Sequence, residues 1–204
     1  MTGNHGLTTP IDTGTRILEA ARACLLADGY ARLSTRKVAD EAGVPLSQIH
    51  YHFGSKDELI LSLLRAETDR LLDRQTDMFR RELPLWKRWK LACEYFDVDI
   101  SSGYVRVLQE MTAAGWSSET VGKEMRQIME GWGQLLLSVA RDAEAKGISL
   151  GGFTPEEAVA LVSAAFVGAE SLILLGMEAD ELPLRGALRR VGELIRVAEE
   201  GQAR

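Results

Sequence analysis

The chain has 204 residues, which is enough for one or two small domains with a buried core. Hydrophobic residues make up 46% of it and charged residues 26%, which are ordinary values for a globular protein and not those of a disordered chain. The formal net charge of −6 does not by itself indicate a protein that binds nucleic acid.

The first elements in chain order are a polar N-terminus and one helix. Residues 1–13 have no apolar signal core, so we expect a flexible segment there and a cytoplasmic protein. From Ile17 to Leu25 apolar residues recur at helical spacing, and Gly29 ends this helix. We expect no disulfide between Cys24 and Cys93, because the sequence has no secretory feature.

Residues 35–54 predict two short helices around a tight turn. Ala39 is small enough to let two helices cross closely, and Gly43 can take the positive φ that the turn needs. Pro45 then stands at the start of the next helix, where a missing N–H has no cost. The small core that would fix the crossing is Val38, Ala42, Val44 and Ile49. This is the helix-turn-helix pattern, whose second helix enters a DNA major groove.

The charge distribution agrees with this pattern. Residues 14–56 hold six basic and four acidic side chains, a net charge of +2, which leaves −8 for the rest of the chain. That asymmetry has the sign expected of an N-terminal DNA reader on an acidic body.

The rest of the chain also reads as helical. A capping box at Ser55–Glu58 starts a long helix that Pro84 ends, and Thr154–Glu157 is a second strong helix start. Gly131 or Gly133 could interrupt one of the later helices. These later helices are expected over about 102–114, 118–146, 155–178 and 184–200. No β alternation appears, so the sequence predicts an all-α fold.

Two runs in the first third make the pattern more specific. They are Ser34-Thr35-x-x-Val38-Ala39-x-x-Ala42-Gly43-Val44 and His50-Tyr51-His52-Phe53-x-Ser55-Lys56-x-x-Leu59. With the preceding helix they resemble the tetracycline-repressor (TetR) family over about residues 14–62. The resemblance implies about nine helices: a three-helix DNA-binding head at 14–60, with the helix-turn-helix at about 35–54, and a ligand-binding and dimerisation body at 61–204.

The resemblance assigns DNA contacts residue by residue. The positions matched to phosphate contacts are Thr35, Tyr51, His52 and Lys56, and these groups would position the protein without reading sequence. Base reading would fall to Ser47, Gln48 and His50, with Leu46 near a thymine methyl and Arg36 reaching a base or a phosphate. His50 stands where the family often has tyrosine. A plainer reading of Lys56 is a solvated lysine.

Aromatic and methionine residues cluster between 86 and 132, including all four tryptophans. Such side chains suit an adaptable apolar pocket, although their helical spacing is also what a plain core requires. The candidate pocket residues are Trp89, Phe96, Tyr104, Met111, Trp116, Met125, Met129 and Trp132. Arg106, Gln109 and Glu110 are candidates for orienting a ligand.

The segment from 158 to 177 is apolar on more than one side. A helix buried on two protein faces explains it better than a membrane span, because Glu170 lies within it. Together with the last helix it predicts a four-helix interface between two copies of the chain. The candidate interface residues are Leu161, Ala165, Phe166, Ala169, Leu172, Leu188, Val191 and Ile195.

These patterns lead to a functional hypothesis of a homodimeric repressor, released from a palindromic DNA operator by a small, largely apolar or aromatic ligand. The alternatives are an activator or ligand-insensitive regulator of the same fold, and a helical carrier of apolar ligands without a DNA role. The sequence has no nucleophile–base pair or glycine-rich phosphate loop, so we expect no enzyme and no cofactor. We expect no metal site either, since His50 and His52 would lie on nearly opposite faces of a helix.

Overall fold

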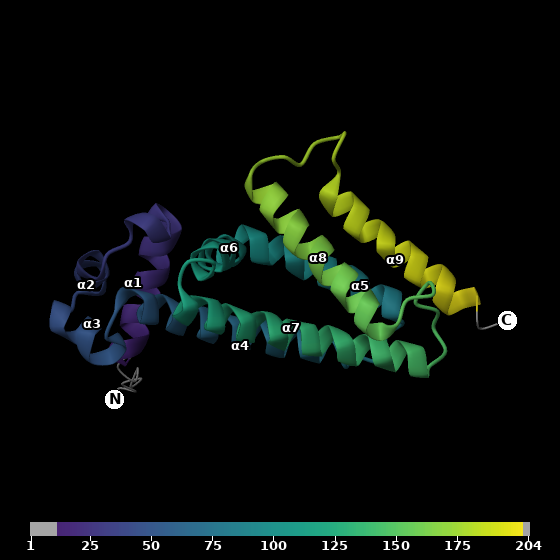
Figure 1. Cartoon of the computed structure of the whole chain (residues 1–204), viewed down its shortest axis with the longest axis horizontal. Helices are drawn as coiled ribbons and strands as arrows, with labels where there is room; N and C mark the ends of the chain where they lie inside the picture. The colour runs from purple at the N-terminus through teal and green to yellow at the C-terminus, as the bar shows by residue number, and fades with distance from the viewer. Residues whose placement is uncertain (1–11, 202–204) are drawn as a thin grey trace, which may run out of the picture. The chain divides into compact units, whose positions relative to one another are not determined.

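The computed structural model describes residues 12–201, in which helices are joined by short turns and loops (Figure 1). It contains nine α-helices and one 3₁₀ turn, and no strand occurs within these residues, which confirms the predicted all-α fold. The chain divides into two compact units with the boundary between Leu64 and Arg65, inside the fourth helix. Residues 1–11 of the expected flexible segment lie outside the described range.

The first unit is a small helical head. Its helices are α1 (Thr13–Asp28), the turn η1 (Tyr30–Arg32), α2 (Thr35–Ala42), α3 (Leu46–Phe53) and the start of α4 (Lys56–Phe79). Ile17, Leu25, Val38 and Ile49 are fully buried at its centre. Ala42 and Val44, expected in this core, are only half-buried at its margin.

The ends of the head helices follow from local side-chain chemistry. The Ser34 hydroxyl accepts a hydrogen bond from the Lys37 amide at 3.2 Å and caps α2. Gly43 ends α2 with φ 62° and ψ 40°, the left-handed conformation expected of it. Because a side chain is strained in that conformation, glycine is what lets α3 start only three residues later.

The second unit carries the remaining helices, α5 (Leu85–Ser101), α6 (Tyr104–Gly115), α7 (Glu119–Ala145), α8 (Pro155–Leu174) and α9 (Leu184–Gly201). Helix α7 is continuous, so Gly131 and Gly133 do not interrupt it. A side chain at Gly131 would stand 3.2 Å from the Leu72 methyl, so this glycine permits close packing of α7 against α4.

Helix α8 begins with the predicted capping box, in which Thr154 and Glu157 exchange side-chain and backbone hydrogen bonds. It ends at Leu174, earlier than expected, because Gly176 takes φ 73°. It is the one described helix long and apolar enough to cross a membrane by length and composition. Helices α6, α7 and α9 pack along it, but Pro155 and Ala169 are its only buried residues, so part of its apolar surface is not covered within this chain.

Candidate functional site

Helix α3 presents a polar face on a fixed apolar support. Ile49 is fully buried beneath it, with Leu46 and Phe53 half-buried one turn away on either side. The 3.6-residue period therefore turns Ser47, His50, Tyr51 and His52 outward, and Tyr51 is 82% exposed. Gln48 is half-buried at the edge of this face. Helix α3 thus carries Leu46, Ser47, Gln48 and His50, proposed for base contact, together with Tyr51 and His52, two of the residues proposed for phosphate contact.

Three of these side chains already make contacts within the head. His50 Nδ1 lies 3.0 Å from the Gly54 carbonyl oxygen, so a base contact by this ring would use Nε2. The rings of Tyr51 and His52 meet edge to face, with centroids 5.1 Å apart. Such contacts restrict the rotamers of these side chains before DNA binds. Fewer rotamers are then lost on binding, which lowers the entropic cost of contacting DNA.

The N-terminus of α2 supplies a second set of candidate contacts. Thr35 is half-buried at the first helical position and Arg36 is exposed beside it. Free backbone N–H groups at such a helix end favour a phosphate. Lys37, also exposed, is paired with Asp28, and this hydrogen bond lowers the pKa of the Asp28 carboxyl.

Lys56 has an internal role that the sequence did not show. Its Nζ donates a hydrogen bond to the Tyr30 carbonyl oxygen at 2.7 Å and lies 4.1 Å from the centroid of the Tyr30 ring. The Tyr30 hydroxyl in turn donates to Asp57 at 2.6 Å, and burial raises the pKa of Tyr30 to about 12. These contacts tie the start of α4 to η1. An ammonium has three N–H donors, so a phosphate contact by Lys56 stays a prediction.

Sequence reasoning also missed Arg16. Its Nη2 donates to the carbonyl oxygens of Ala42 at 2.9 Å and Gly43 at 3.4 Å, which fastens α1 to the turn between α2 and α3. No local signal marks this contact, because the partners are 26 and 27 residues apart in the sequence.

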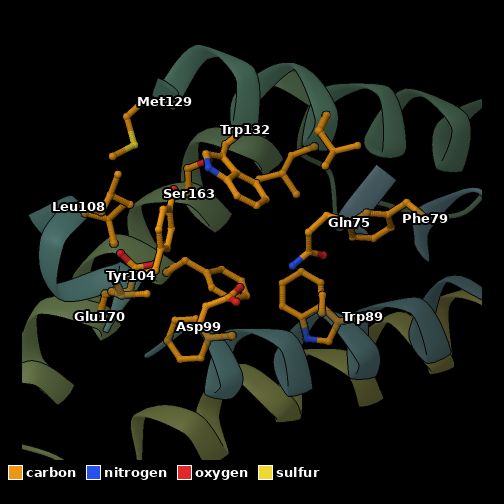
Figure 2. A pocket seen from close by; sticks show the side chains of 17 residues that line it. Gln75, Phe79, Trp89, Asp99, Tyr104, Leu108, Met129, Trp132, Ser163 and Glu170 are labelled. Atoms are coloured by element: carbon orange, nitrogen blue, oxygen red, sulfur yellow. The ribbon is translucent and has the colours of Figure 1, made fainter. Parts of the chain in front are cut away.

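The second unit contains a cavity of about 190 Å³ between α4, α5, α6, α7 and α8 (Figure 2). Five of the candidate pocket residues line it: Trp89, Phe96, Tyr104, Met129 and Trp132. The other lining residues are Gln75, Phe79, Ala92, Asp99, Val105, Leu108, Leu135, Leu136, Ser163, Phe166, Val167 and Glu170. Aromatic rings therefore form much of the wall, which is typical of a small-molecule site.

The structure corrects the other three candidates. Met111 and Met125 are buried but do not line the cavity. Each lies about one helical turn from the nearest lining residue of its helix, Leu108 on α6 and Met129 on α7. Trp116 follows the end of α6 and is 84% exposed. Helical spacing could not separate these positions, because a core and a cavity require the same apolar pattern.

Two carboxyl groups stand in the apolar wall, and neither was predicted as a site residue. Asp99 is buried and accepts two hydrogen bonds from Arg74 Nη2, each 2.8 Å long. Glu170 accepts a hydrogen bond of 2.8 Å from Gln109 Nε2. The signal available for Glu170 was its position as a lone acid within the long apolar run of α8.

Burial is the largest influence on the pKa of both acids. It raises the pKa of Asp99, while the hydrogen bond and charge of Arg74 oppose the rise. It raises the pKa of Glu170 to about 7; the hydrogen bond from Gln109 opposes this rise and the charge of Asp99 adds to it. Gln109, one of the polar residues proposed to orient a ligand, does not line the cavity but donates a hydrogen bond to Glu170, which does. Arg106 and Glu110 pair with each other at 3.3 Å and do not line the cavity.

An apolar surface lies on α8 and α9. Leu161, Leu194 and Val197 are 56%, 67% and 63% exposed, and the first two line a groove of about 460 Å³. Of the predicted interface residues, Ala165 is exposed, and Phe166, Leu172, Val191 and Ile195 are half-buried. The prediction is wrong for Ala169 and Leu188, which are buried with Trp89 in the core of their own unit and cannot reach a partner.

Within residues 12–201, no group of three or more His, Cys, Asp or Glu side chains is arranged to hold a metal ion. Cys24 and Cys93 are buried free thiols. Burial raises the pKa of Cys93 to about 11, so this thiol is protonated at neutral pH and is a poor nucleophile.

Comparison with known proteins shows which family the head resembles. Residues 17–63 match the family model described as bacterial regulatory proteins, tetR family. Residues 17–63 therefore carry the helix-turn-helix domain of the TetR family. The transcriptional repressor AcnR of Corynebacterium efficiens is 33% identical over 64 residues, which cover 31% of this chain and 34% of AcnR. The matched segment is thus about a third of that relative, and the TetR likeness in sequence is concentrated in the DNA-binding head.

Solved structures extend the likeness in fold to most of the chain. A TetR transcription regulator from Haloarcula marismortui has a TM-score of 0.76 at 21% identity, covering 90% of this chain and 96% of its own. The regulator FadR of Bacillus subtilis, solved in complex with stearoyl-CoA, has a TM-score of 0.71 at 16% identity, covering 89% and 96%. At these identities the likeness shows a shared all-α fold.

Proposed function

We propose that this protein is a cytoplasmic DNA-binding transcriptional regulator, a homodimeric repressor that a small, largely apolar or aromatic ligand releases from a palindromic operator. The observation that carries the proposal is the outward polar face of α3, fixed on buried Ile49 inside the segment that matches the TetR family model. That arrangement is what insertion into a major groove requires.

In this proposal the head residues divide into two groups. Ser47, Gln48 and His50 read base edges, and a glutamine amide can bind adenine with two hydrogen bonds. Leu46 contacts a thymine methyl. The contacts that position the protein on phosphates are Thr35, Arg36, Tyr51, His52 and Lys56.

The body supplies the dimer. The exposed apolar side chains of α8 and α9, together with Ala165, form a surface that a second copy would cover. Covering it would remove apolar area from water at a gain of about 25 cal/mol per Å². A two-fold dimer places its two α3 helices on half-sites related by the same symmetry, so the operator is expected to be palindromic.

The aromatic cavity is the proposed effector site. Helix α4 begins at Lys56 and supplies Gln75 and Phe79 to the cavity wall, so one continuous helix carries residues of both functions. A ligand releases DNA only if it binds better to the conformation that fits DNA poorly. A change from mostly bound to mostly free requires several kcal/mol of such differential affinity, about 5 kcal/mol for a shift from 99:1 to 1:99.

Selection of genomic fragments on the full-length protein tests the DNA role. We expect enrichment of a palindromic site, followed by a mobility shift at low salt that a fragment with scrambled half-sites does not show. If no fragment is enriched and the protein binds all sequences equally, the regulator proposal is wrong.

A further inference from the structure

The cavity of the second unit combines aromatic walls with an acidic charge balance. We propose that its ligand is an organic cation with an apolar body, an aromatic or alkyl amine or a quaternary ammonium, and that Glu170 is its counter-ion. The inference rests on the proposed function only in taking this cavity for the effector site.

The two carboxyl groups of the cavity differ in what compensates them. Asp99 already has a cation, because Arg74 donates to both of its oxygens at 2.8 Å and itself lies 4.3 Å from the centroid of the Tyr95 ring. The hydrogen-bond partner of Glu170 is the neutral amide of Gln109, which in turn accepts from Ser171 at 3.2 Å. Once ionised, Glu170 therefore leaves one negative charge for a ligand to balance.

The wall itself disfavours an anion. Among the residues that line the cavity in the described part of the chain, two are acidic and none is Lys or Arg. An anionic ligand would enter against the charge of Glu170 and gain no basic partner, whereas a cation would meet a carboxylate that burial has left poorly solvated. The raised pKa of Glu170 reflects that poor solvation, and a bound cation would lower it again.

The aromatic side chains suit the rest of such a ligand. The Trp89 indole N–H donates to the Leu188 carbonyl oxygen at 2.9 Å, so its polar atom is occupied. The Phe166 ring meets Trp89 and Phe96 edge to face, with centroids 5.7 and 5.2 Å apart. Figure 2 shows Glu170 beside Tyr104 at one end of the cavity, with Gln75 and Phe79 toward the other. Aromatic rings near a carboxylate are the setting in which quaternary ammonium groups are recognised.

A pair of isosteric probes separates charge from shape. Benzyltrimethylammonium and neopentylbenzene have the same outline and differ in one nitrogen and its charge. Binding of each to the full-length protein is measured at pH 8 by quenching of tryptophan fluorescence, since Trp89 and Trp132 line the cavity. We expect the cation to bind at least tenfold more tightly than the hydrocarbon. Equal binding, tighter binding of the hydrocarbon, or no binding of the cation would overturn the proposal.

Variants then assign the charge to one side chain. Glu170→Gln keeps an oxygen that accepts from Gln109, and we expect it to lower affinity for the cation at least tenfold while affinity for neopentylbenzene changes less than threefold. The matched control is Glu130→Gln, an exposed acid on α7, which should leave both affinities unchanged. Unchanged cation binding in Glu170→Gln would overturn the role of Glu170, and the wild-type comparison of the two probes does not depend on whether that variant folds.

The pH dependence supplies a further readout. With a free pKa of about 7, Glu170 is ionised in about one molecule in thirty at pH 5.5, so the cation should bind about 30-fold more weakly there than at pH 8. The charged and titratable groups near Glu170 are Asp99, held by Arg74, and Tyr104. The three histidines of the chain all lie within the first 52 residues, outside this unit. Affinity that does not change with pH would contradict the counter-ion role.

DNA binding is measured in parallel on the same preparations. Cation binding without operator binding would refute the regulator proposal and leave this inference standing. Operator binding by a protein that binds neopentylbenzene but not the cation would do the reverse.

Discussion

Replacing Glu170 with glutamine should make the second unit more stable at alkaline pH. In the wild type the folded chain holds the Glu170 proton with a pKa of about 7, against 4.5 for an ordinary glutamate. The folded state therefore binds this proton more tightly than the unfolded state, and the wild type loses stability as pH rises from about 4.5 to about 7. Glutamine does not titrate, so the variant escapes that loss.

The size of the effect follows from the two pKa values. A difference of about 2.5 pKa units at about 1.36 kcal/mol per unit corresponds to about 3 kcal/mol. Relative to the wild type, Glu170→Gln should therefore gain about 3 kcal/mol of unfolding free energy between pH 4 and pH 8. Glutamine can still accept the hydrogen bond from Gln109, so no buried donor is left without its partner.

Urea denaturation of both proteins across that pH range, followed by tryptophan fluorescence, measures this difference. All four tryptophans lie between residues 86 and 132, so the signal reports the unit that contains Glu170. All other side chains are common to both proteins, so their contributions cancel, and protein concentration is held constant because dimerisation would add stability. A difference that stays flat with pH, or a variant less stable than the wild type at pH 8, would refute the reasoning.

Three other outcomes test the head and the dimer surface. Ile49→Ala should destabilise the head by about 2–4 kcal/mol, because it leaves a cavity under α3, and hydrogen exchange of the α2 and α3 amides would show it. Gln48→Ala should weaken binding by about 1–3 kcal/mol at one operator position and relax the preference there, whereas Tyr51→Ala should weaken binding to all sequences alike. Leu194→Asp should convert the proposed dimer to a monomer in sedimentation experiments.

Each of these has an outcome that contradicts it. Equal weakening on every sequence by Gln48→Ala would remove its base-reading role. Unchanged exchange rates in Ile49→Ala would show that α3 does not depend on this core. Leu194→Asp that sediments like the wild type, with an unchanged circular dichroism spectrum, would place the interface elsewhere.

The sequence by itself determined where most of the helices begin and end, with the C-terminal end of α8 as an exception. The hydroxyl of Ser34, the glycine at 43 and the capping box at Thr154 act on backbone groups three or four residues away, so the residues alone reveal them. The same local signals distinguish the motif of the TetR family. Helix α8 was likewise predicted from its composition, as was an apolar side that its own chain leaves uncovered.

Only the tertiary structure decided which side chains meet. Lys56 and Tyr30 are 26 residues apart, Gln109 and Glu170 are 61 apart, and no periodicity encodes such pairs. The apolar pattern that predicted a pocket was shared by Met111 in the core and Trp89 at the cavity wall. Helical spacing states which residues share a face, but how far each helix slides along its neighbours is set by packing. That packing left Trp116 in solvent and enclosed Asp99 and Glu170 among aromatic rings.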